Sequence, residues 1–200
     1  MRDDWVSPWW QAVNLPALWD VCGVSAPSLS VWHTFALENI GNPYLCGGRP
    51  DQDSAASLLL FARLDMAGGQ RLIAGPCYRA RQMHRMYRRL RKVDPADLDA
   101  ACREYVETCT RAASRFNAKS GGKPCAVPYQ FHIVRRLALS GMTFEQAWNT
   151  PYALARCYYD AAAEADGDDS IMTAAAQEME DNWEDYAPKQ KAELCKPSRN

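Results

Sequence analysis

Apolar residues recur every three to four positions over most of the chain, which is the spacing of one face of an α-helix. A dense apolar run from Ala55 to about Met66 predicts a well-buried helix that Gly68 and Gly69 end. Helices are expected over residues 28–40, 51–66, 76–93, 95–117, 128–139, 143–150, 151–165 and 168–186. Because no run alternates like a β-strand for more than a few residues, we predict an all-α, single-domain irregular helical bundle of about seven helices.

Interruptions of the helical pattern divide the chain into three predicted parts. Residues 1–27 hold four of the seven tryptophans and predict an N-terminal arm that packs on the domain. Residues 28–187 form the expected helical domain, with a loop at 117–127 that is rich in glycine and proline. Residues 188–200 are expected to form a flexible tail.

Within the domain, two local signals predict helix boundaries. Thr143 and Gln146 have the spacing of a capping box, in which each side chain bonds the backbone of the other residue. Pro151 then separates a short helix from a long one.

Composition narrows the class of protein. The chain has 200 residues, an apolar share of 48%, a charged share of 24% and a formal net charge of −1, which is typical of a globular protein without a field favouring nucleic acid or membranes. Its apolar runs fall short of the roughly 20 residues of a membrane span. The start, Met1-Arg2-Asp3-Asp4, does not fit a secretory signal, so the eight cysteines, which form no CxxC pair, are expected to be reduced.

The sequence offers no catalytic motif. Pro124 stands where a phosphate-binding loop has the Ser or Thr after its lysine, and residues 166–170 are not followed by the glycine and glutamate of a calcium loop. His33, His84 and His132 fall on different expected helices and in no metal-binding pattern. We therefore expect no enzyme activity, no cofactor and no metal.

Charge is distributed unevenly along the chain. Seven Arg or Lys residues fall between Arg79 and Lys92, whereas residues 157–187 hold ten acids and no Lys or Arg. The expected basic face comprises Arg81, Arg85, Arg88 and Lys92. We expect the basic and acidic helices to pair within the chain, between copies or with a partner, and we do not expect nucleic acid as the main partner.

One segment resembles a known family. Residues 128–171 read PYQFHIVRRLALSGMTFEQAWNTPYALARCYYDAAAEADGDDSI. In this segment Glu145-Gln146-Ala147-Trp148 and Pro151 lead into an alanine-rich helix with Tyr158-Tyr159 and an acidic end. This order resembles the tail assembly chaperones that tailed phages encode near their tail genes, and residues 37–62 are similar to the front half of such proteins.

The resemblance implies binding rather than catalysis. A tail assembly chaperone would keep an aggregation-prone tape-measure protein soluble, which requires an apolar groove with a polar rim. The candidate partner-binding residues are Trp148, Tyr152, Tyr158 and Tyr159, with Trp9 and Trp10 of the arm as a lid. All six residues are equally compatible with a plain core role.

The sequence is also compatible with two alternative functions. One is a structural virion component, such as a head–tail adaptor or a minor tail protein. The other is a nucleic-acid-binding regulator that uses the helix over residues 79–92. For a phage-encoded protein we expect the host cytoplasm or the virion as the location. The expected partner is another phage protein or a second copy of the chain, and no membrane is expected.

Overall fold

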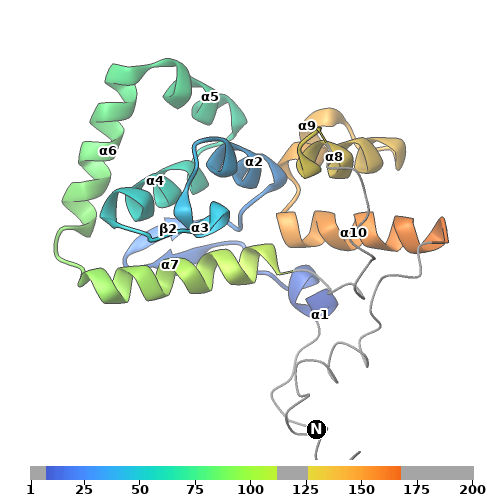
Figure 1. The fold of residues 1–200 in the computed structure, drawn as a ribbon, viewed down its shortest axis with the longest axis horizontal. Coiled ribbons are helices and arrows are strands. Elements are labelled where there is room, and N and C mark those ends of the chain that lie inside the picture. The colour runs from blue at the N-terminus through green and yellow to red at the C-terminus, as the bar shows by residue number, and fades with distance from the viewer. Residues whose placement is uncertain (1–7, 112–125, 168–200) are drawn as a thin grey trace, which may run out of the picture.

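A computed structural model of the chain describes residues 8–111 and 126–167. Within these residues the fold is mostly helical, with ten helices and one two-stranded sheet (Figure 1). The helices are α1 (Pro8–Val13), α2 (Val31–Asn39), α3 (Pro43–Cys46), α4 (Gln52–Ala62), α5 (Met66–Ala74), α6 (Pro76–Leu90), α7 (Pro95–Thr110), α8 (Tyr129–Leu139), α9 (Phe144–Asn149) and α10 (Tyr152–Ala165). The strands are β1 (Trp19–Val21) and β2 (Val24–Ala26). The all-α expectation is thus confirmed in its broad form, with more helices than the seven expected.

The boundary between α4 and α5 differs from the prediction. The helix expected to run to Met66 ends at Ala62, and Asp65 caps a new helix by accepting a hydrogen bond from the Gly68 amide at 2.6 Å. Gly68 and Gly69 lie buried inside α5 rather than ending a helix. The prediction was wrong because it treated the two glycines as the end of a helix. Gly69 instead lies within α5, where it allows the Trp32 indole to approach the backbone closely.

The tryptophan-rich arm contains the small antiparallel sheet. Its strands pair Trp19 with Ala26 and are joined by Cys22 and Gly23, whose φ angles are both positive, at 52° and 78°. This conformation suits a two-residue hairpin turn, and the Asp20 carboxylate accepts a hydrogen bond from the Gly23 amide at 2.7 Å. The hairpin packs against α7, and α1 packs against α10.

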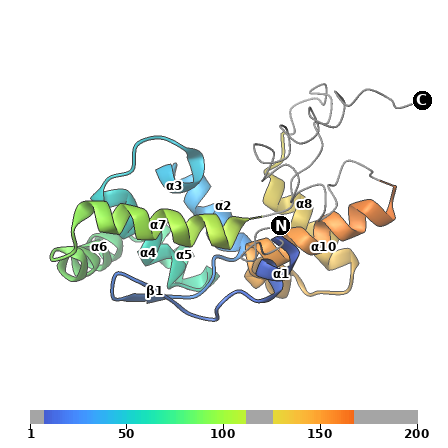
Figure 2. The same cartoon turned by 90° about the horizontal axis from the view of Figure 1, so that it is seen from below.

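Helix α2 lies at the centre of the molecule. It contacts α4 and α5 on one side and α8 and α9 on the other (Figures 1 and 2). A backbone link beside it joins distant parts of the chain, because the Val31 amide donates to the Thr150 carbonyl at 3.1 Å and the Tyr152 amide donates to the Leu29 carbonyl at 2.8 Å. The C-terminal helices are therefore held against the start of α2.

The expected order of the C-terminal helices is confirmed. Thr143 and Gln146 form the predicted capping box at the start of α9, and Pro151 separates α9 from α10. The side chains of Cys102 and Cys109, which are seven residues apart, are buried on one face of α7.

Membrane-spanning helices, metal-binding groups and disulfides are absent from the described residues. None of the helices in this part of the chain has the length and apolar character needed to span a membrane. This part holds no group of three potential metal-binding side chains, and its six cysteines are free. The expected tail at 188–200, the expected helix at 168–186 and nearly all of the expected loop at 117–127 lie outside the described residues.

Candidate protein-binding groove

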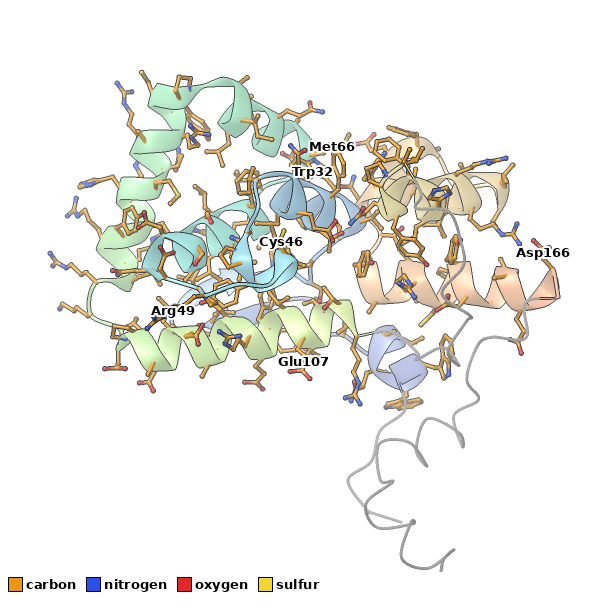
Figure 3. The ribbon with its side chains drawn as sticks, in the orientation of Figure 1. Trp32, Cys46, Arg49, Met66, Glu107 and Asp166 are labelled. Carbon is orange, nitrogen blue, oxygen red and sulfur yellow. The ribbon has the colours of Figure 1, made fainter. Side chains whose placement is uncertain are left out.

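An apolar groove of about 240 Å³ opens where α2, α5, α8 and α9 meet. We call it the aromatic groove, and it is lined by Trp32, Phe35, Ala36, Asn39, Met66, Gln70, Ile73, Phe131, Phe144 and Trp148. Figure 3 shows Trp32 and Met66 close together at the junction of α2 and α5. Because these helices are far apart in sequence, the groove exists only in the folded chain.

Helix geometry explains why these side chains share one surface. Trp32, Phe35, Ala36 and Asn39 recur every three to four residues on α2, and Met66, Gln70 and Ile73 do so on α5. On α9, the Thr143 cap sets the helix start, so that Phe144 and Trp148 lie one turn apart on the same side. Each helix therefore contributes one face to the aromatic groove.

Trp148 is the centre of an aromatic cluster in the floor and walls of the groove. Its ring lies 5.2 Å from Phe131, 5.6 Å from Phe35 and 5.9 Å from Phe144 between centroids. Phe35 and Phe131 also meet edge to face at 5.4 Å. Edge-to-face pairs are directional, so this cluster holds the groove in one shape.

Three apolar side chains at the mouth of the groove are exposed. The exposed fractions are 60% for Phe144, 46% for Ile73 and 40% for Phe131, whereas Trp32 and Trp148 are buried. These three residues come from α9, α5 and α8 and surround one opening. A cluster of exposed apolar side chains around a concave surface is typical of an interaction site.

The groove carries little polar chemistry. Among the described residues that line it, Asn39 and Gln70 are the only polar ones and none is charged at neutral pH. The indole nitrogen of Trp32 is buried and has no hydrogen-bond acceptor in the part of the chain that the structure describes. The arrangement suits burial of an apolar partner surface, with few hydrogen bonds to fix it.

The predicted partner-binding residues lie in different places. Trp148 lines the groove, but Tyr152 and Tyr159 are half-buried, and Tyr159 packs against Tyr129 of α8 at 5.3 Å between ring centroids. Tyr158 is exposed on α10.

The arm residues Trp9 and Trp10 are on α1, which packs on α10 rather than on the helices that line the groove (Figure 1). The structure therefore brings Trp148, but not the other five predicted residues, to the aromatic groove.

Sequence reasoning missed the residues at the mouth. Phe131 stands apart from the inward stripe of α8, and an off-stripe aromatic residue is the signal that could have identified it. Phe144 lies one turn before Trp148 on the same face of α9, so its spacing from Trp148 is the signal that could have identified it. Ile73 gives no comparable signal, because α5 was not predicted as a helix.

Polar side chains outside the groove connect two of the helices that form it. The Gln130 side chain is buried and donates to the Glu38 carboxylate at 2.8 Å, which joins α8 to α2. The Arg156 guanidinium lies 4.7 Å from the centroid of the Tyr129 ring and 3.7 Å from the Asp160 carboxylate. These contacts tie α2, α8 and α10 together behind the groove.

The predicted basic face lies on α6 and in the turn after it, which contribute no residue to the lining of the groove. Arg81, Arg85 and Arg88 are exposed on α6, and Lys92 is exposed in the turn that follows it. This face is separate from the aromatic groove.

Comparison of the chain with protein-family models, with curated proteins and with solved structures gave no match.

Proposed function

We propose that the aromatic groove binds an amphipathic helix of a partner protein. The observation that carries this proposal is the set of three exposed apolar side chains, from three helices, around a floor of buried tryptophans. A helix that lays its apolar face into such a groove removes both surfaces from water, which drives this mode of recognition.

We further propose that the chain is an assembly protein of a tailed phage that acts like a tail assembly chaperone. The resemblance of residues 128–171 supports this role, and this segment supplies α8, α9 and three of the groove aromatics. A tape-measure protein, which is long and helical in this family's expected role, would present apolar helix faces before its tail tube forms. Covering such a face would keep that partner soluble.

The test is co-expression of this chain with the tape-measure protein from the same phage genome. We expect the soluble fraction of the tape-measure protein to rise, and we expect Phe144→Glu to abolish this rise because it places a charge at the mouth of the groove. Leu139→Glu is the matched control, since Leu139 is more exposed than Phe144 and does not line the groove.

Two outcomes would count against the proposal. Equal loss of partner solubility with Phe144→Glu and Leu139→Glu would show that the groove is not the binding surface. Stoichiometric presence of the chain in purified particles would instead favour a structural virion component, such as a head–tail adaptor or a minor tail protein.

A further inference from the structure

We propose that α6 binds the phosphate backbone of double-stranded DNA through its outer face. This surface is independent of the aromatic groove and does not require the proposed chaperone role. The proposal rests on the placement of the α6 arginines, on the absence of ion pairs to them within the described residues and on the exposed position of the helix.

The basic residues of α6 form one stripe. Those that recur at intervals of three and four positions, which we call the arginine stripe, are Arg81, Arg85, Arg88, Arg89 and Lys92, and all five are exposed. The opposite side of the helix carries Met86 and Leu90, which are buried in the core. With a rise of 1.5 Å per residue, the stripe extends over about 16 Å.

No carboxylate on its own segment offsets this charge. Between Asp65 and Asp94 the sequence contains no Asp or Glu. On the neighbouring α4, Asp53 accepts a hydrogen bond from the Tyr87 hydroxyl. Within the described ranges, none of the five residues of the stripe forms an ion pair.

The described part of the acidic region, residues 157–167, lies away from α6. Its residues Asp160, Glu164 and Asp166 lie on or directly after α10, which is at the opposite end of the molecule from α6 (Figures 1 and 2). Asp166 pairs with Arg136 of α8 at 2.5 Å. The internal pairing that argued against nucleic acid in the sequence is therefore not made by these three acids.

The stripe carries an energetic cost that a ligand would remove. Like charges three or four residues apart destabilise a helix by a few tenths of a kcal/mol per pair, and here they follow one another along one face. Four of the five residues are arginine, whose planar guanidinium binds phosphate through two parallel hydrogen bonds. A ligand that carries many phosphates would neutralise the repulsion between these side chains and would accept the paired hydrogen bonds of the guanidinium groups.

The position of α6 favours a duplex as the ligand. The helix forms an outer edge of the molecule in both views (Figures 1 and 2), and Figure 3 shows side chains projecting outward along that edge. The major groove of DNA, about 12 Å wide, admits a single helix with phosphates on either side. Because the proposed contacts of the stripe are to phosphates and not to base edges, we expect binding without sequence preference.

The test measures binding of the full chain to a fluorescently labelled duplex of random sequence by anisotropy at several salt concentrations. Five phosphate contacts predict a slope of log K against log salt of about −4 to −5. Arg85→Glu combined with Arg88→Glu should weaken binding at least tenfold and reduce the magnitude of the slope by about 2.

A matched control combines Arg63→Glu with Arg135→Glu, which changes the net charge equally at exposed residues outside the stripe. Equal weakening by both double variants would overturn the proposal, as would the absence of salt-dependent DNA binding. Loss of self-association in the stripe variant, without DNA binding by the natural chain, would also overturn it and assign the stripe to the acidic region of a second copy. Phe144→Glu should leave DNA binding unchanged, which separates this proposal from the groove.

Discussion

Gly69 shows how one residue decides the packing of two helices. A Cβ atom at this position would lie 2.6 Å from Cζ2 and 2.8 Å from Cη2 of the Trp32 indole. Such a separation is far below van der Waals contact, so the indole would have to move. The glycine that the sequence analysis interpreted as a helix end is needed here for close approach inside a helix.

We therefore predict that Gly69→Ala lowers the free energy of unfolding by about 1–3 kcal/mol, although alanine favours a helix by about 1 kcal/mol. Combining it with Trp32→Phe removes the two clashing indole atoms. In that background Gly69→Ala should be neutral or stabilising, as measured by urea denaturation. Equal destabilisation in both backgrounds would contradict the proposed clash.

His33 is a second residue whose role only the fold reveals. Its Nδ1 atom accepts a hydrogen bond from the Ser30 amide at 3.0 Å, so Nε2 carries the proton and donates to the Leu64 carbonyl at 2.7 Å. Burial lowers the pKa of this imidazole below its ordinary value, while the Leu64 carbonyl acts in the opposite direction. The folded state therefore favours the neutral form of the His33 imidazole.

This arrangement predicts a pH dependence of stability. Between the lowered native pKa and the unfolded pKa of about 6.5, the unfolded chain binds the proton more strongly, so stability is full above this range and falls as the pH decreases. His33→Gln should lose about 1–3 kcal/mol at pH 7.5 and show a shallower decline toward pH 5.5. His84→Gln, at an exposed position of α6, is the control, and parallel curves for natural chain and His33→Gln would refute the assignment.

At the scale of elements, the sequence predicted the helices whose ends carry strong local signals. Pro76 and Pro95 at first turns, the Thr143 capping box and Pro151 all mark boundaries that the structure has. The hairpin was missed because three-residue strands are too short to show alternation. Its only local signal was the Cys22-Gly23 turn, which is weak without flanking strands.

The arginine stripe makes a prediction about the stability of α6 itself. Arg85→Glu places a carboxylate one turn from both Arg81 and Arg89, which replaces repulsion by attraction. We expect the free energy of unfolding to rise by about 0.5–1 kcal/mol at low salt, and we expect added salt to reduce this gain. Urea denaturation at two salt concentrations measures it, with Arg135→Glu as the control, and a loss of stability would show that Arg85 has a favourable interaction.

At the scale of the molecule, the aromatic groove could not be predicted from the sequence. Trp148 was identified because it belongs to a motif, but Phe35, Ile73 and Phe131 line the same groove only through the packing of α2, α5 and α8. Periodicity states which face of a helix is apolar and does not state which helices are neighbours. The polar link between Gln130 and Glu38 was hidden for the same reason.

The backbone link between Val31 and Thr150 predicts how the whole molecule unfolds. Because α2 packs on helices from both halves of the chain, we expect one cooperative transition, in which the amides of Leu59 in α4 and Val134 in α8 exchange hydrogen with the same free energy. Val31→Pro removes the amide that donates to Thr150, and proline is tolerated here because Val31 is the first residue of α2 and Ser30 is extended.

In this variant the protection of Val134 should fall further than that of Leu59, because the C-terminal helices lose one of their two backbone bonds to the segment beside α2. Val31→Ala keeps the amide and shortens the buried side chain, so it should lower both protections equally. Native-state hydrogen exchange measures the two amides in one experiment. Lower protection of Val134 already in the natural chain would mean that the C-terminal helices open on their own, and that the mouth of the groove opens with them.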